Sequence, residues 1–338
     1  MYKIKSKPED FHVREVIDLK TNDSGRFAYF WLKKRGLGTE EAVLRICEKC
    51  RVPRKMINYS GLKDKHAVTE QAISIRREFA GKLQDFRDDR IQLELLGFGD
   101  ERINLGTHSA NRFRIVVRNI ASKPRVPFVF PNYFDEQRFS KNNALVGKHI
   151  INENFNEAAR LLAQSEFNLE RQVKRVLDEN ASDPVRALRQ IPRRILSLYV
   201  HAYQSLIFNE ILAEHVARHS SEYFSVPYSE GVFRFPLDRI PDRELPIVGF
   251  GTSRQVIEEF SIEVSPRQFI VRQIPELSSE GTTRPALINI SELEVGALEE
   301  DEMNPGNKKC TVAFMLPKSS YATIVVRALF SQAETGKT

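Results

Sequence analysis

The sequence predicts a mixed α+β protein with more than one domain. Its first 80 residues show strand and helix patterns in the order β-α-β-β, which is one half of a ferredoxin-like or RRM-like unit. The chain has 338 residues, enough for two or three domains. From 218 to about 290 the prolines multiply and short apolar runs alternate with turns, which indicates a separate mixed subdomain.

The first half-unit can be followed element by element. Residues 26–32 (RFAYFWL) are rich in aromatic side chains and predict a strand that ends before a glycine turn. Thr39 is placed as the N-cap of a helix over 40–50, since two glutamates follow it and apolar residues recur at helical spacing. Strands are expected at 56–60 and 72–76, with a polar loop between them.

The later elements follow from the same periodicities. Further strands are predicted at 91–98 and 112–120, the second from a clear alternation in RFRIVVRNI. Amphipathic helices are predicted at 155–164 and 195–217. A strand at 311–316 and a helix at 321–330 complete the chain's regular pattern.

Composition bounds the class of protein. Hydrophobic residues make up 41% and charged residues 28%, which suits a globular protein with a buried core. No apolar run reaches the ~18 residues of a membrane helix, and the N-terminus lacks an apolar signal segment, so we expect a cytoplasmic protein without a membrane partner. Lys and Arg exceed Asp and Glu by six. The surplus gathers in four runs, each compatible with RNA or with a solvated face: Lys33-Lys34-Arg35, Arg76-Arg77, Arg193-Arg194 and Lys308-Lys309.

Metal chemistry is not expected. Cys47 and Cys50 form a C-x-x-C, but only Cys310 remains as a further thiol, and a structural zinc site needs four ligands. His215 and His219 are four residues apart on a predicted helix without a third ligand. The sequence therefore predicts reduced, buried cysteines and no metal site.

One polar loop carries candidate chemistry. Asp64 lies between two predicted strands, with Lys63 and Lys65 on either side and a glycine that permits a tight turn. A charged carboxylate beside cations on a rigid sheet suits covalent catalysis by aspartate. An ordinary surface turn has the same composition, so the residues alone leave both interpretations open.

The residues 61–71, GLKDKHAVTEQ, resemble the signature G-x-K-D-[RK]-x-A-x-T-x-Q of the TruD family of pseudouridine synthases. Further segments resemble that family in the same order: KSKPEDFHVRE at 5–15, PNYFDEQRF at 131–139, YQSLIFN at 203–209 and FMLPKSSYAT at 314–323. The resemblance is thin across 218–290. Asp135, Ser140 and Ser319 stand where the family pattern has glycine.

The resemblance implies which residues form the active site. Asp64 takes the place of the nucleophile, and Lys5 that of a lysine that pairs with the catalytic carboxylate. Aromatic and amide side chains expected to contact the flipped-out nucleotide are Phe11, Asn132, Phe134 and Tyr321, and Lys63 is grouped with these substrate-binding residues.

The resemblance also implies a fold and an activity. The expected catalytic domain, 1–157 with 289–338, has a long mixed, mainly antiparallel sheet made of two ferredoxin/RRM-like halves, and 158–288 is expected to be an inserted TRUD domain. The expected reaction isomerises uridine to pseudouridine in tRNA, at uridine 13 of the D arm, without a metal or cofactor. Attack at the ribose, through a glycal, is favoured over attack at the base, and a monomer is expected. RNAs besides tRNA stay open as substrates.

Two rival functions belong to other classes. A catalytically silent RNA-binding module would keep the fold without product. A metal-dependent or nucleophilic hydrolase would need paired acids, a Ser-His pair or metal-ligand spacing, and the sequence shows none of these patterns.

Overall fold

The computed structural model describes residues 1–164, 168–180 and 182–331. These residues form two compact units. The first unit comprises Met1–Arg125, Asn289–Ala322 and the described residues from Leu329 on, and the second comprises Val126–Ile288 with Thr323–Ala328. Residues 126–157 thus pack with the second unit, while the predicted insertion over 158–288 stays a prediction. Part of the predicted C-terminal portion, 332–338, lies outside the described residues.

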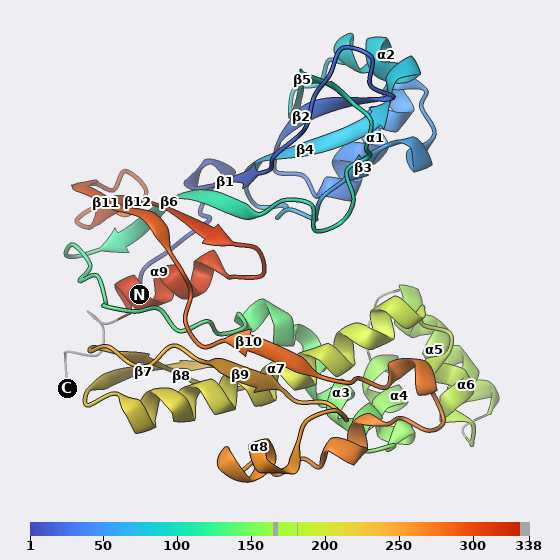
Figure 1. The fold of residues 1–338 in the computed structure, drawn as a ribbon, viewed down its shortest axis with the longest axis vertical. Helices are drawn as coiled ribbons and strands as arrows, with labels where there is room; N and C mark the ends of the chain where they lie inside the picture. Colours follow the sequence, from blue (N-terminus) through green and yellow to red (C-terminus); the bar gives the residue numbers. More distant parts are fainter. Residues whose placement is uncertain (165–167, 181, 332–338) are drawn as a thin grey trace. The chain divides into compact units, whose positions relative to one another are not determined.

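The first unit is built on one eight-stranded sheet, with strand order β11-β12-β6-β1-β4-β2-β5 and β3 paired to β4 (Figure 1). Only β1 and β4 run parallel, so the sheet is mixed and mainly antiparallel, as predicted. The strands are β1 (Phe11–Val16), β2 (Phe27–Arg35), β3 (Asn58–Tyr59), β4 (Val68–Arg76), β5 (Ile91–Gly99), β6 (Ala110–Ile120), β11 (Ser291–Glu300) and β12 (Lys308–Pro317).

Two helices cover one face of the first half of this sheet. They are α1 (Thr39–Cys50) and α2 (Ala80–Gln84), with the short turns η2 (Arg54–Met56) and η3 (Arg77–Phe79) beside them. The side chains of Phe30 and Leu32 from β2 and of Ile73 from β4 pack with α1 in the core of this half. Burial of these apolar side chains is the main force that fixes the half-unit.

The start of α1 corrects one prediction. Gly38, not Thr39, is the N-cap residue, and Thr39 is the first helical residue. The hydroxyl of Thr39 donates a 2.9 Å hydrogen bond to Gln71 Oε1 on β4 instead of capping the helix. A local cap competes with any other partner for the same hydroxyl, and here the buried glutamine of the sheet is that partner.

Several elements were not predicted, and three of them show why. β1, at FHVREV, has charged residues inside a six-residue strand. β11, at SELEVGALEE, is largely exposed and rich in glutamate, a residue that is depleted in strands. α3 (Asn143–Ile151) contains a glycine that lowers its helix propensity. At that glycine, Gly147, an added Cβ would lie 2.0 Å from Tyr199 O, so close helix packing requires it.

The second unit is organised around a long helix, α7 (Arg193–His219), which α3 and the hairpin strands contact (Figure 1). Its other helices are α4 (Phe155–Ala163), α5 (Asn168–Glu179), α6 (Pro184–Leu188) and α8 (Arg254–Glu259), and most of α9 (Ala322–Phe330) also belongs to it. The predicted mixed region holds two strand pairs, β7 (Tyr223–Tyr228) with β8 (Gly231–Pro236), and β9 (Glu244–Ile247) with β10 (Thr282–Pro285). Among the described residues, no helix is both long and apolar enough to cross a membrane.

Candidate active site around Asp64

The loop that carries Asp64 joins β3 to β4 in the first unit and is closed by its own motif residues. Gln71 Nε2 donates to Gly61 O at 2.9 Å, so the last residue of the motif holds the first. The Lys63 N–H donates to Thr39 Oγ1 at 2.9 Å, which ties the loop to the start of α1. This pattern gives Gly61 and Gln71 a structural reason to be in one motif, because together they fix the conformation of the loop.

The ammonium of a buried lysine also fixes this loop through hydrogen bonds to main-chain carbonyl groups. The side chain of Lys34 is fully buried, and its Nζ donates to Leu37 O at 2.6 Å and to Asp64 O at 2.9 Å, with Lys63 O at 3.5 Å. Burial lowers the pKa of Lys34 to about 8. Its ammonium is thus satisfied by main-chain carbonyl groups, and one of them belongs to Asp64 itself. Sequence analysis missed Lys34 as a site residue.

Lys63 is turned away from Asp64. Its Nζ lies 3.0 Å from Glu15 Oε1 and donates to Asn111 Oδ1 at 2.5 Å, and its side chain is only 8% exposed. Glu15 is also buried, and it accepts hydrogen bonds from Ser60 Oγ at 2.6 Å and from the Ala72 N–H at 3.1 Å. The described contacts therefore make Lys63 an anchor of the loop, and its predicted contact with substrate stays a prediction.

The carboxylate of Asp64 faces Lys5. Lys5 Nζ donates to Asp64 Oδ2 at 2.6 Å, although the two residues are 59 positions apart. Within the described part of the chain, no other side chain pairs with this carboxylate, which is 42% exposed. The ion pair therefore engages one carboxylate oxygen and leaves Asp64 accessible to a reacting group.

Phe11 joins this pair. The ammonium of Lys5 lies 4.3 Å from the centroid of the Phe11 ring, a cation–π distance. Phe11 is 3% exposed and meets Phe113 of β6 edge-on, with 6.1 Å between the ring centroids. Of the predicted site residues, the structure thus brings Asp64, Lys5 and Phe11 together, whereas the Lys63 ammonium bonds Glu15 and Asn111.

The segment before Phe11 is fixed by a buried ion network. The guanidinium of Arg118 donates two 2.9 Å hydrogen bonds to the carboxylate of Asp10, at the end of η1 (Pro8–Asp10), and one to Asp301. Burial alone would raise the pKa of Asp301, but hydrogen bonds from the Asn119 N–H, from Asn304 and from Arg118 hold it at about 2. This network joins the N-terminal segment to β6 and to the end of β11.

Asn132 and Phe134 belong to the second unit, where both are buried. Asn132 Oδ1 accepts from Arg284 Nη2 at 2.6 Å, and its Nδ2 donates to Pro285 O at 3.1 Å. Phe134 packs edge-on against Phe208, and the Arg284 guanidinium lies 4.3 Å from its ring centroid. Arg284, which sequence analysis did not single out, thus links the two predicted residues.

Tyr321, in the first unit, is half-buried and directly precedes α9. Two residues earlier, Ser319 has a φ of 70°, in the left-handed region where the family pattern places glycine. Asp135 has no such positive φ, so its backbone does not require glycine. The departure at Ser319 therefore has a conformational cost that the departure at Asp135 does not have.

The candidate metal ligands of the sequence do not converge in the described residues. No group of three or more His, Cys, Asp or Glu side chains is arranged there to hold a metal ion. Cys47, Cys50 and Cys310 are free and buried, as predicted. His215 and His219 instead bond main-chain carbonyl oxygens of Pro241 and His215.

Comparison with known proteins gives a consistent result. A family model described as tRNA pseudouridine synthase D (TruD) matches residues 2–169, 162–226 and 251–329. The chain is 30% identical to the tRNA pseudouridine synthase D of Aquifex aeolicus, covering 97% of this chain and 98% of that protein. It is 29% identical to a Methanocaldococcus jannaschii protein named "Probable tRNA pseudouridine synthase D 2", covering 99% and 93%. A crystal structure titled as that of the "Putative tRNA pseudouridine synthase D (TruD)" from Methanosarcina mazei matches with a TM-score of 0.75 and 27% identity, over 97% of this chain and 93% of that one.

Proposed function

Since the chain belongs to the tRNA pseudouridine synthase D (TruD) family and is thus an isomerase, we propose that it converts uridine 13 of the tRNA D arm into pseudouridine with Asp64 as nucleophile. The observation that carries this proposal is the Lys5–Asp64 pair. It joins two segments 59 residues apart at 2.6 Å, on a loop that Gln71 and Lys34 fix. A fixed carboxylate with one oxygen engaged and an accessible surface is what a nucleophile in a rigid site requires.

The proposed reaction is an isomerisation, so uridine and pseudouridine contain the same atoms. Asp64 attacks the flipped-out nucleotide, at the ribose or at the uracil ring, with the ribose route through a glycal preferred. The bond between N1 of uracil and C1′ of the ribose breaks, and the uracil rotates while it is held in the site. The bond that Asp64 formed then breaks and returns the free carboxylate, C5 joins C1′, the C5 proton leaves, and N1 gains a proton. No metal or cofactor takes part in this proposal.

Flipping the target nucleotide costs a few kcal/mol of lost stacking. Aromatic faces recover roughly 1–3 kcal/mol for each stacked base. In the proposal, Phe11 forms a wall of the site beside Lys5, and Tyr321 stacks on the uracil. Lys5 orients the Asp64 carboxylate through the ion pair, and Lys63 keeps the loop in place through Glu15.

Asn132 and Phe134 complete the proposed nucleotide contacts. The side-chain amide of Asn132 is hydrogen-bonded to the Arg284 guanidinium and to Pro285 O, which supports a positioning function for this residue. Phe134 is buried among its own unit's side chains, which supports packing beside the base rather than an open stacking face. We further propose that 158–288 is the family's insertion, and that the protein acts as a monomer in the cytoplasm.

Pseudouridine mapping tests the proposal. Unmodified tRNA is treated with wild type or with Asp64→Ala, and carbodiimide adducts are located by primer extension. The proposal predicts one new stop at uridine 13 with wild type, and none with the variant, which still binds tRNA. Equal patterns from the two proteins would contradict Asp64 as nucleophile, and a stop at another uridine would contradict the assigned position.

A further inference from the structure

The basic run at the end of β2 is divided between two faces of the sheet. Successive strand residues point to opposite faces, so Lys34 shares the helix-covered face with Leu32, whereas Lys33 and Arg35 point to the other. We refer to this second side as the open face. The Lys34 side chain bonds the Asp64 loop, whereas the described side-chain contacts of Lys33 and Arg35 are with Glu70 and Glu9. Their function is not explained by the proposed chemistry.

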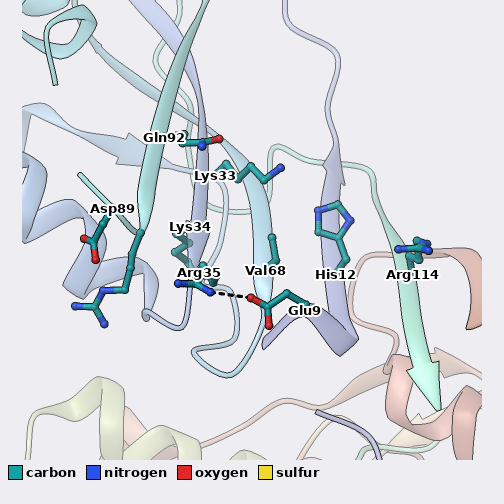
Figure 2. A pocket seen from close by; sticks show the side chains of 10 residues that line it. Glu9, His12, Lys33, Lys34, Arg35, Val68, Asp89, Gln92 and Arg114 are labelled. Atoms are coloured by element: carbon teal, nitrogen blue, oxygen red, sulfur yellow. Dashed lines mark hydrogen bonds and ion pairs between the residues drawn. The ribbon is translucent and has the colours of Figure 1, made fainter. Parts of the chain in front are cut away.

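The strand register aligns Arg35 with cations of other strands. Arg35 is opposite Val68, Val68 is opposite His12, and His12 is opposite Arg114, across β2, β4, β1 and β6. Neighbouring strands are ~4.8 Å apart, so this row is about 14 Å wide. Figure 2 shows these four side chains next to one another on adjacent strands, with Lys33 close by.

A second row runs two residues further along the strands. Lys33 is opposite Glu70, Glu70 is opposite Arg14, and Arg14 is opposite Arg112. The two rows form what we call the basic array, which consists of Arg14, Lys33, Arg35, Arg112 and Arg114. One carboxylate, Glu70, lies inside it.

That carboxylate is shared rather than paired. Glu70 lies 3.0 Å from His12, 3.4 Å from Lys33 and 3.6 Å from Arg14. At the edges, Glu9 pairs with Arg35 and Glu292 with Arg112, so five permanent cations face three acids. Among the described residues, Arg114 has no acidic partner.

Two of the other basic runs differ from this one. Lys308 and Lys309 are paired with Glu300 and Glu302. Arg77 donates to main-chain carbonyl oxygens and lies over the Phe98 ring. The sequence alone could not separate the neutralised run Lys308-Lys309 from the open one, because strand register determines which side chains gather.

The array lines a hollow rather than a flat surface. A pocket of about 410 Å³ is bounded by the cations Lys33, Arg35, Arg90 and Arg114, by the acids Glu9 and Asp89, and by Val68 as an apolar element (Figure 2). The paired side chains of the array remain half exposed, from 48% for Lys33 to 57% for Arg35. Like charges on facing strand positions destabilise a sheet, so folding alone gives no reason to collect them here.

We propose that the basic array binds the phosphate backbone of a tRNA segment other than the target nucleotide. The ligand class follows from the chemistry: several fixed guanidinium and ammonium groups, spread over about 14 Å beside a shallow hollow, match repeated phosphates. Asp64's loop is anchored by residues of the opposite sheet face, so this contact is separate from the reacting uridine. The inference rests on the proposed function, since it takes tRNA as the substrate.

Salt-dependent binding tests the inference. The dissociation constant of unmodified tRNA is measured at several salt concentrations for wild type and for the double variant Lys33→Gln/Arg114→Gln. The matched control is Lys55→Gln/Lys82→Gln, which removes the same charge from exposed residues of η2 and α2. Losing phosphate contacts should weaken binding about tenfold at low salt and reduce the salt slope by about one per contact, while the control binds like wild type.

A stability measurement separates binding from a structural role. The free energy of unfolding of the array variant should be close to that of wild type, because the variant loses only the half-exposed contact of Lys33 with Glu70, and Arg114 has no acidic partner among the described residues. Binding and salt slope equal to wild type would overturn the inference, as would an equal loss in the control.

Pseudouridine formation by wild type on the same tRNA is measured in parallel. If wild type forms product but the array variant binds normally, the inference alone fails; if wild type binds through the array but forms none, the proposed function alone fails. A wild type that does not bind tRNA overturns both.

Discussion

Replacing Arg118 by methionine should destabilise the first unit by about 3–5 kcal/mol, because it strands buried carboxylates. Asp10 loses both of its 2.9 Å hydrogen bonds from the guanidinium and keeps one from the Lys7 N–H at 3.1 Å. Asp301 keeps donors from the Asn119 and Met303 N–H groups and from Asn304. Most of the cost therefore comes from Asp10, whose side chain is fully buried.

The chain offers a reporter and a matched control for this experiment. Its single tryptophan, Trp31, lies on β2, so the fluorescence of this residue in a denaturant titration follows unfolding of the first unit. Arg112, on the same strand as Arg118, also donates two hydrogen bonds to one carboxylate, that of Glu292. Both members of that pair are about half exposed, at 53% and 52%. Arg112→Met should therefore cost less than about 1 kcal/mol.

Two outcomes would refute the reasoning. A cost below about 1 kcal/mol for Arg118→Met would show that the buried network does not hold the N-terminal segment. Equal costs for the Arg118 and Arg112 variants would show that burial does not set the magnitude. Adding Asp10→Asn to Arg118→Met removes the stranded charge and should recover part of the loss, which a double-mutant cycle measures.

Three further predictions concern the Asp64 loop and its surroundings. Burial lowers the pKa of Lys34 from 10.5 to about 8. Between those pH values the unfolded chain binds more protons than the folded one, so the contribution of Lys34 to the free energy of unfolding increases with pH. Denaturant titrations followed by Trp31 fluorescence at about pH 7.5 and about pH 9.5 should show this increase in wild type and not in Lys34→Met. Gln71→Ala removes the donor to Gly61 O and should lower the single-turnover rate at least ~10-fold, whereas an unchanged rate would mean that the loop needs no such closure. Ser319→Gly should raise the free energy of unfolding by up to about 1 kcal/mol, since glycine adopts a φ of 70° without strain, and a loss would show that the serine side chain matters more.

How much of this could be predicted depends on where each residue's partner lies. The strands around 27–35 and 110–120 were predicted because aromatic content and alternation are local signals. The family and the mixed sheet also followed from contiguous motifs. Asp64 was singled out because its whole motif lies within eleven residues, 61–71.

The supporting residues could not be predicted in the same way. Arg118 and Asp10 are 108 positions apart, and polar groups in a core acquire partners only once the fold exists. Lys34 carried a usable signal, since it has the same strand parity as the buried Leu32. Because Lys34 lies in the basic run Lys33-Lys34-Arg35, it was treated only as one of that run's cations. Thr39 was misplaced for a related reason, because its hydroxyl bonds a residue 32 positions away rather than its own helix.

The most direct test of the account is a single-turnover measurement of C5 proton release. tRNA labelled with tritium at C5 of its uridines loses that label when C5 forms the bond to C1′, so tritium release counts the reaction itself. Wild type and Asp64→Asn are compared at saturating protein, with tRNA affinity and Trp31-monitored stability measured for both. The account predicts release of one tritium per tRNA by wild type and none above background by the variant, with binding and folding retained. Release by Asp64→Asn within about tenfold of the wild-type rate would contradict Asp64 as the nucleophile.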